Sequence, residues 1–196
     1  SGFIGKIGDD EVGHLFRSTE IGVENSIDPC YFEEWDQKYL IWGSFNGLYI
    51  TELTEDGLGI KNWKGAKRIA GTAFEGVMIH KHGDYYYLFA STGSCCEGVK
   101  STYQTVVGRS RSLMGPYISK SGEQLLNNSR TVIITANDRW KGPGHNSEII
   151  TDDEGQDWIM YHAYDAQNPD KGRVLMLDRL LWDKNNWPYV EGGSPS

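Results

Sequence analysis

No long apolar run occurs in this sequence, and this absence excludes a helix that spans a membrane. Such a helix needs about 18 or more consecutive apolar residues, and no window approaches that length. The opening residues, SGFIGKIGDD, also lack the basic-then-apolar layout of a signal peptide. We therefore expect neither a membrane span nor a membrane partner.

Basic residues are in short supply. The 196 residues include 19 Lys and Arg against 27 Asp and Glu, which gives a formal net charge of −8. A protein that binds nucleic acid usually presents a basic surface to the phosphates. We therefore expect no nucleic-acid partner, and a neutral ligand fits the charge balance better.

Cysteines are also few. The three of them, Cys30, Cys95 and Cys96, are too unevenly spaced for a disulfide scaffold or a zinc site. We interpret Cys30 as a small buried hydrophobic residue. For the adjacent Cys95 and Cys96 we expect two free thiols, with a local disulfide as the open alternative.

A sustained helical period of apolar residues is missing as well, since no stretch beyond about ten residues keeps one. Aromatic residues make up 12% of the chain, and there are 24 Gly. This composition is typical of β-rich proteins with many tight turns. Core packing explains most of these rings, and a carbohydrate-stacking surface is the functional alternative.

Three segments of the chain repeat one pattern. They are DPCYFEEWDQKYLIWGS (28–44), EGVMIHKHGDYYYLFAS (75–91) and HNSEIITDDEGQDWIMYHA (145–163). In each, a polar residue leads a short strand, a polar turn follows, and an aromatic-rich strand ends in small residues. The turns are EEWDQK, HKHGD and TDDEGQ, and we interpret the acidic third turn as a solvated hairpin rather than a calcium loop.

A further apolar strand follows each hairpin, at residues 47–53, 105–110 and 172–180. Alternating apolar and polar residues bounded by Gly, Asn and Asp indicate antiparallel sheet. Each repeat has room for about four short strands, the size of one propeller blade. We predict an all-β chain of about three four-stranded antiparallel β-propeller blades. The predicted divisions are the tail of a preceding blade (1–27), two blades (28–70 and 71–140) and a final blade (141–196).

The leading residues of the three repeats are Asp28, Glu75 and His145. The innermost strand of each blade begins near the propeller axis, so we expect these side chains to converge on one central cavity. Paired carboxylates in a concave site suit glycoside hydrolysis. Apolar neighbours such as Phe74 would keep Glu75 protonated near neutrality, as a general acid requires.

Short motifs carry a family resemblance. The runs SIDP (26–29), AFEG (73–76) and GPGHN (142–146), with the closing segment 161–190, resemble in order and spacing the five-bladed propellers of glycoside hydrolase family 43. Within that family, the segment 93–117 looks closest to arabinanases and α-L-arabinofuranosidases. The resemblance implies an inverting enzyme acting on arabinan or arabinoxylan side chains, secreted or periplasmic. It leaves endo or exo action open, and β-xylosidase activity on xylan as well.

The resemblance also implies roles for the converging residues. It assigns Glu75 as the general acid and Asp28 as the carboxylate that modulates the pKa of the acid and orients it. His145 matches the residue that faces an axial metal ion, commonly calcium, whereas alone it would be interpreted as a core histidine. An oligo- or polysaccharide is the expected substrate.

This chain departs from the family at the general base. Family members place that Asp on a first blade, which this chain lacks, and Asp9 and Asp10 are poor substitutes in a Gly-rich stretch. Three blades cannot close a ring. We therefore expect a fragment, a nicked chain completed by a second polypeptide, or a protomer that associates. The alternative function is a non-catalytic carbohydrate-binding propeller fragment or an assembly module.

A further set of residues is expected on the cleft-bearing face as substrate contacts. Phe45 could stack on a sugar or pack in the core, and Arg173 could bind a sugar hydroxyl or form a surface salt bridge. We interpret Arg109 as structural. The predicted substrate-binding set is Ser44, Phe45, Phe74, Cys95, Cys96, Glu97 and Arg173.

Overall fold

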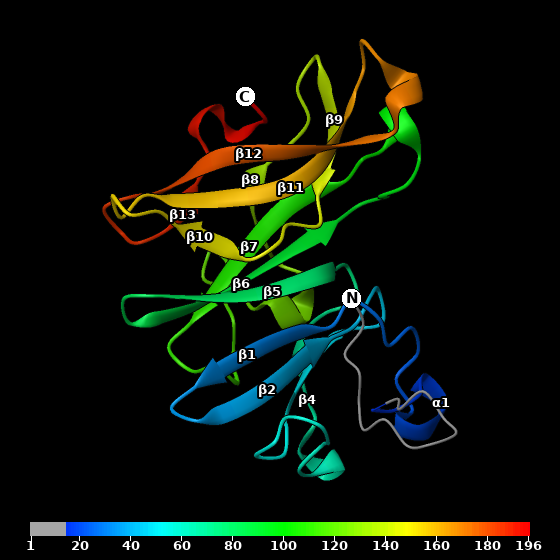
Figure 1. Cartoon of the computed structure of the whole chain (residues 1–196), viewed down its shortest axis with the longest axis vertical. Coiled ribbons are helices and arrows are strands. Elements are labelled where there is room, and N and C mark those ends of the chain that lie inside the picture. The colour runs from blue at the N-terminus through cyan, green and yellow to red at the C-terminus, as the bar shows by residue number, and fades with distance from the viewer. Residues whose placement is uncertain (1–14) are drawn as a thin grey trace.

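The computed structural model describes residues 15–196, which form three antiparallel sheets and one short helix, α1 (Ser18–Ile21). The sheets follow one another in chain order along the long axis of the molecule, from blue through green to red (Figure 1). The predicted all-β class with four-stranded antiparallel sheets is confirmed. No helix in the described part of the chain is long and apolar enough to cross a membrane.

Each sheet pairs strands that are neighbours in sequence, with one exception in the third sheet, where the first strand skips the second and pairs with the third. The first sheet contains β1 (Cys30–Glu34), β2 (Gln37–Trp42), β3 (Leu48–Glu52) and β4 (Lys67–Ala70). The second sheet contains β5 (Glu75–His82), β6 (Tyr85–Thr92), β7 (Gln104–Ser110) and β8 (Thr131–Ile134). The third sheet contains β9 (Trp140–Gly144), β10 (Ile149–Thr151), β11 (Asp157–Asp165), β12 (Arg173–Trp182) and β13 (Pro188–Tyr189). Single 3₁₀ turns lie at Trp63–Gly65, Gly98–Lys100, Leu125–Asn127, Pro169–Lys171 and Glu191–Gly193.

The first hairpin turn is tighter than the sequence predicts. β1 continues to Glu34 and β2 begins at Gln37, so only Trp35 and Asp36 form the turn. Both have left-handed backbone angles, with φ of 52° and 63°. Positive φ at both central residues matches the right-handed twist of paired strands, so residues expected in the loop extend the ladder instead.

Two apolar clusters join the three sheets. The first contains Ile50 and Phe74 and lies between the first and second sheets. The second contains Phe89 and Ile159 and lies between the second and third sheets. Cys30 is half-buried and packs against both, and burial raises the pKa of its thiol. Because each cluster is shared by two sheets, every sheet is held in place by its neighbour.

Arg109 of β7 links the second and third sheets, as its structural assignment predicted. Its Nη1 donates hydrogen bonds to the carbonyl oxygens of Asn185 and Asn186, at 2.6 and 3.0 Å. Its guanidinium stacks between the rings of Tyr85 and Trp187, at 4.3 and 4.2 Å. These contacts hold the Arg109 side chain between the two sheets.

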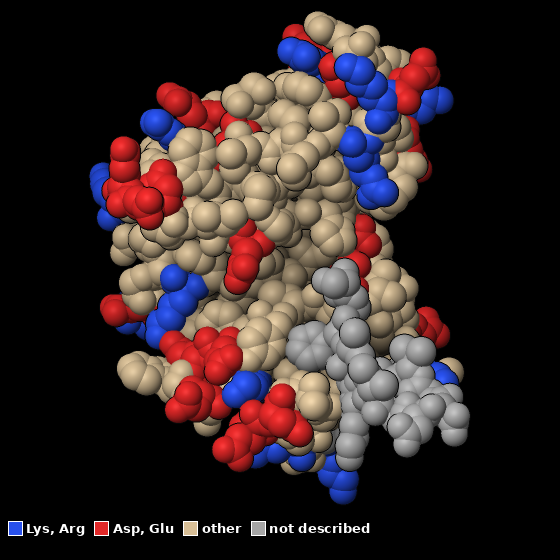
Figure 2. All heavy atoms as spheres, viewed as in Figure 1, with Lys and Arg blue, Asp and Glu red and all other residues tan. Residues whose placement is uncertain are grey.

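Charged residues are mixed on the surface. On the face drawn in Figure 2, Asp and Glu lie beside Lys and Arg, and no continuous basic area covers the described residues. The turn after β10 carries Asp152, whose carboxylate accepts hydrogen bonds from the backbone of Glu154 and Gln156 and from the Trp158 indole. The hydrogen bonds of this carboxylate are therefore made within the hairpin itself.

Candidate functional site

In every sheet, a residue with left-handed backbone angles lies within or close to the axial end of the innermost strand. These residues are Asp28, Gly76 and His145, with φ of 57°, 60° and 51°. In the second sheet, Glu75 pairs with Ser91 and Met78 pairs with Phe89, so the register shifts by one residue between these two pairs. A slip with a left-handed residue is the signature of a β-bulge, which bends a strand and redirects its side chains.

The bulges show that the alignment of the three sequence repeats is off by one residue. The N–H of Gly43 bonds to the carbonyl of Ile27, and Gly144 pairs with His162. Glu75 is therefore equivalent to Ile27 and Gly144, the residues before the bulge, rather than to the bulge residues. His145 also does not lead a strand, since it lies between β9 and β10. Alignment by residue type could not detect the bulges, because they alter register without leaving a pattern in the sequence.

The three bulge residues meet around one open cavity of about 750 Å³, which we call the axial hollow. The N–H of Gly76 donates a hydrogen bond to Asp28 Oδ2 at 3.0 Å. A Cβ on Gly76 would lie 3.1 Å from Cγ of the His145 ring, so glycine allows that ring to rest on the backbone. The axial hollow is lined by Asp28, Pro29, Cys30, Tyr31, Gly76, Val77, Met78, His145, Asn146, Ser147 and Glu148.

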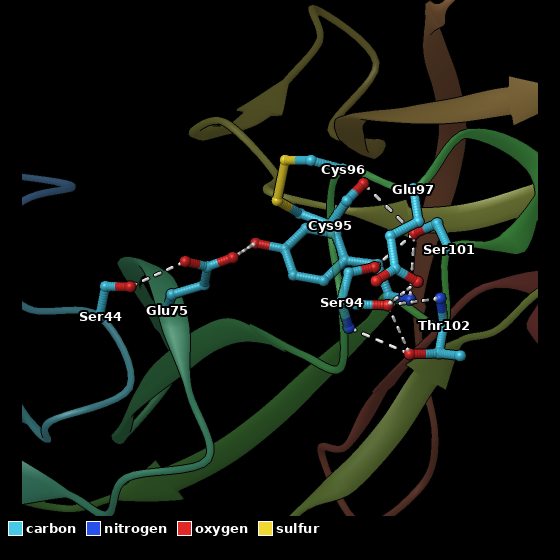
Figure 3. Close-up of a disulfide and its surroundings, with 9 residues drawn as sticks. Ser44, Glu75, Ser94, Cys95, Cys96, Glu97, Ser101 and Thr102 are labelled. Atoms are coloured by element: carbon cyan, nitrogen blue, oxygen red, sulfur yellow. Dashed lines mark hydrogen bonds between the residues drawn. A yellow bond between two sulfur atoms is a disulfide. The ribbon is translucent and has the colours of Figure 1, made fainter.

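Glu75 is the buried carboxylate beside this hollow, with 8% of its surface exposed. Ser44 Oγ donates to its Oε2 at 2.8 Å, and Tyr103 Oη donates to its Oε1 at 2.7 Å. Figure 3 shows Ser44, in the loop after β2, and Glu75, at the start of β5, reaching toward each other. Burial, and then the bond to Glu75, raises the pKa of Tyr103 far above its ordinary value, so its hydroxyl stays a donor. The two hydroxyls hold the carboxyl in one orientation.

Two histidines lie on the third-sheet side of the site. His145 is exposed, and its backbone N–H donates a hydrogen bond to Ser91 Oγ at 2.7 Å. Neither ring nitrogen of His162 has a hydrogen-bond partner among residues 15–196, and its ring stacks on that of Tyr103. Burial, followed by the charges of Arg173 and His145, lowers the pKa of His162 to about 4. His162 is therefore neutral at neutral pH.

A hard cation would find oxygen ligands in the axial hollow. Asn146 is only 4% exposed, and its buried side-chain oxygen has no hydrogen-bond partner among the described residues. Asp28 and Glu148 contribute carboxylates to the same lining. Calcium takes oxygen ligands and water, so these oxygens could serve it, with the His145 imidazole beside the ion.

The predicted substrate contacts separate into three groups. Ser44 is 1% exposed and donates a hydrogen bond to Glu75, so it supports that carboxyl rather than lining a surface. Phe45 is 39% exposed and available to a ligand. Phe74 is fully buried in the first cluster, which corrects its assignment, because it offers no surface to a sugar. Arg173 is exposed and forms no ion pair within residues 15–196, so the predicted surface salt bridge is not found there.

Cys95 and Cys96 form a disulfide, so the expectation of two free thiols is wrong. The pair lies in the loop between β6 and β7 (Figure 3). Glu97 follows the pair and is exposed, and its carboxylate accepts a bond from Ser94 Oγ at 3.2 Å. Asp9 and Asp10 lie outside the described residues.

Comparison with known proteins identifies the family. The model of glycosyl hydrolases family 43 matches residues 10–188. The chain belongs to glycoside hydrolase family 43. It is 36% identical to the extracellular exo-α-(1→5)-L-arabinofuranosidase of Cellvibrio japonicus, over 85% of this chain and 52% of that protein. It is 35% identical to the extracellular endo-α-(1→5)-L-arabinanase 1 of Bacillus subtilis, over 90% of this chain and 54% of that protein.

Solved structures of this family agree with the fold. The Cellvibrio cellulosa α-L-arabinanase complexed with arabinohexaose matches with a TM-score of 0.79 and 35% identity, covering 86% of this chain and 58% of that one. The predicted resemblance to family 43 propellers is thereby confirmed. This family 43 chain spans about half the length of the curated relatives it matches.

Sequence reasoning missed several residues of the site. Tyr103 stands one residue before β7, and Ser91 lies near the end of β6, the two strands that continue from Glu75 in the same sheet. Their position at the axial edge of the second sheet was the available signal. His162 and the amide of Asn146 gave none, because their lack of partners exists only in the folded chain.

Proposed function

We propose that this chain supplies the general acid of an inverting glycoside hydrolase that acts on arabinan. One observation carries the proposal. Glu75 is a buried carboxylate held by hydroxyls from two sheets, beside a hollow where the innermost strands meet. Burying a charged carboxylate costs free energy. A general acid must hold its proton, and burial favours the protonated form. The arabinan-acting names of the relatives support the substrate class.

The hydrogen bonds suggest which oxygen carries the proton. Tyr103 stays protonated and donates to Oε1. A serine hydroxyl can accept as well as donate, so Ser44 can turn to accept a proton bound to Oε2. In this proposal Oε2 transfers its proton to the departing sugar oxygen, and Tyr103 stabilises the carboxylate that remains. The hydroxyl of Ser44 then returns to donating.

Asp28 acts in this proposal as a positioning residue. Its carboxylate binds the N–H of Gly76, directly after Glu75, and so fixes the backbone that carries the acid. A general base must activate water on the opposite face of the sugar, with about 6.5–9.5 Å between the two carboxyl groups. We propose that a further polypeptide segment supplies this base and completes the ring.

The fit of the axial hollow to a hard cation supports a calcium proposal. His145, Asn146 and the carboxylates of Asp28 and Glu148 line the hollow and would hold a hydrated ion mainly through water, because the His, Asp and Glu among them are not grouped as closely as the ligands of a shared ion. Such an ion would supply positive charge beside the acid and hold the three bulges together. Dialysis against a chelator should lower the melting temperature, and added calcium should restore it, with the effect absent in His145→Ala. Indifference of the protein to both treatments would contradict calcium binding.

The test of the proposed function uses the natural protein with every polypeptide that copurifies with it. We expect it to release arabino-oligosaccharides or arabinose from arabinan, with a first product of inverted anomeric configuration by NMR. The product lengths would separate internal from terminal cleavage, and xylan would serve as the competing substrate. Binding of arabinan without any release would favour a non-catalytic carbohydrate-binding protein. By analogy with the extracellular relatives, we also propose that the protein is secreted.

A further inference from the structure

A second cluster of ligand-type side chains lies at the far end of the strand that begins with Glu75. His80 and His82 are two residues apart on β5, so both project from the same face of the strand. At about 3.3 Å per residue, they stand roughly 20 Å along the strand from Glu75. The cluster is therefore separate from the axial hollow and from the chemistry proposed there.

The two imidazoles face a carboxylate of the neighbouring sheet. Asp157, the first residue of β11, is 8% exposed, and both histidines are half-buried. The candidate ligand atoms of the three residues all lie within 4.8 Å of one another. Among the residues the structure describes, no other set of three or more His, Cys, Asp or Glu is grouped this closely.

The separation between His82 and Asp157 fits an ion between them better than a direct bond. His82 Nδ1 lies 3.8 Å from Asp157 Oδ2, which is too long for a hydrogen bond. Two ligand atoms that each lie about 2.1 Å from one tetrahedral zinc ion are about 3.4 Å apart, so this pair would need to close by only a few tenths of an ångström. The ligand atom of the third residue, His80, lies within 4.8 Å of the other two and would move closer to them when an ion binds.

Neighbouring groups orient the carboxylate and one imidazole. The Trp182 indole Nε1 donates to Asp157 Oδ2 at 2.7 Å, and Thr151 Oγ1 donates to Oδ1 at 2.6 Å. The Trp182 ring also stacks on His82, with centroids 3.7 Å apart and an angle of 8°. An ionised carboxylate has about four acceptor positions, so two remain for an ion. Outer contacts of this kind hold ligands in place at protein metal sites.

Neither imidazole is otherwise engaged by hydrogen bonding. Within residues 15–196, no hydrogen bond is made by the ring nitrogens of His80, and the long contact to Asp157 is the polar contact of His82. The structure thus presents two imidazole ligands and an anchored carboxylate without a hydrogen bond joining them.

We propose that His80, His82 and Asp157 bind a divalent transition-metal ion such as zinc, which bridges the second and third sheets. Two imidazoles and one carboxylate form a donor set that favours zinc over calcium. Water completes the coordination, because both histidines are partly open to solvent. The ion joins β5 to β11 and stabilises the packing of the two sheets.

Zinc titration by calorimetry, on chelator-treated and dialysed full-length chain, tests this site. We expect one zinc ion per chain and a raised melting temperature. His82→Gln should weaken binding by tenfold or more. The matched control is His145→Gln, which removes an imidazole from the axial hollow and should leave this zinc binding unchanged. Equal loss in the control, or retained affinity in His82→Gln, would overturn the proposal.

A direct measurement covers the case in which His82→Gln does not fold. Crystals of the wild-type chain grown with zinc chloride should show anomalous density at the zinc edge, between the two imidazoles and Asp157. Density only at His145, only at cysteine sulfur, or nowhere would refute the assignment. This outcome does not depend on activity, so it is separate from the test of the proposed function.

Discussion

At the scale of single residues, the hydroxyls of Ser44 and Tyr103 define the candidate acid. A hydrogen bond to a charged group contributes about 1.5–3 kcal/mol, and 1.4 kcal/mol corresponds to about tenfold in rate. In the active assembly, we expect Ser44→Ala and Tyr103→Phe each to lower kcat about tenfold with little change in KM. The reason is that both hydroxyls orient Glu75 rather than bind substrate.

The control for that prediction is Tyr189→Phe, which removes an exposed hydroxyl of β13. Steady-state kinetics on arabino-oligosaccharides would compare the three variants with wild type. Unchanged kcat in both site variants would mean that the hydroxyls only satisfy a buried carboxylate.

His162 predicts a dependence of stability on pH. Its folded-state pKa of about 4 lies below the 6.5 of an unfolded histidine. The unfolded chain therefore takes up the proton first as the pH falls, and the stability present above pH 6.5 is lost between about 6.5 and 4. We expect the free energy of unfolding in urea to fall less between pH 7 and 4.5 in His162→Gln than in wild type. An identical fall in both proteins would contradict this account.

The internal repeats and the family resemblance predicted part of the site. Asp28 and His145 were expected at the axis, and both line the axial hollow. Glu75 was expected with them, and its buried carboxyl lies beside that hollow. The hydrogen-bond partners of Glu75 were not predicted: Tyr103 lies at the axial edge of the same sheet, but its contact with the carboxyl depends on how the loops and sheets pack. Phe74 was misassigned for a related reason, since burial depends on the neighbouring sheet.

At the scale of elements, the β-bulges position the site. The bulge at Gly76 lets Asp28 bind the backbone and lets the His145 ring approach it. The repeats in the sequence predicted the hairpins and the strands that follow them, because period-two alternation is strong there. They did not predict the bulges or β9, because register is determined by pairing partners.

Two glycines of β5 and its turn test the role of the bulge. Gly76 and Gly83 have nearly equal φ, 60° and 57°, but a Cβ at Gly83 would meet no atom within 4 Å. A left-handed alanine costs about 1–2 kcal/mol. We expect Gly83→Ala to lower the free energy of unfolding by about 1 kcal/mol and Gly76→Ala by about 2–3 kcal/mol, measured in urea.

The excess loss in Gly76→Ala should come from contact with the His145 ring, which would lie 3.1 Å from the new Cβ. Adding His145→Ala to that variant should therefore recover most of the difference between the two glycine positions. Equal losses in both single variants would show that the ring does not depend on the bulge.

At the scale of the whole molecule, three sheets joined by two shared clusters form part of a larger ring. Composition and repeat length predicted this architecture, and the matching structure with a TM-score of 0.79 agrees. The chain covers 58% of that structure. Since a propeller site is assembled from several blades, an acid in one sheet acts only with groups from others. Under the proposed function, activity belongs to the assembled ring, and we expect it to depend on the segment that supplies the base.

The most direct test of the central claim is turnover by the active assembly carrying Glu75→Gln. Glutamine keeps the shape of the side chain but cannot supply the proton, so we expect kcat on arabino-oligosaccharides to fall by at least a thousandfold, with binding retained. Glu123→Gln makes the same chemical change at an exposed position and should turn over like wild type. Wild-type turnover by Glu75→Gln would show that the acid lies elsewhere.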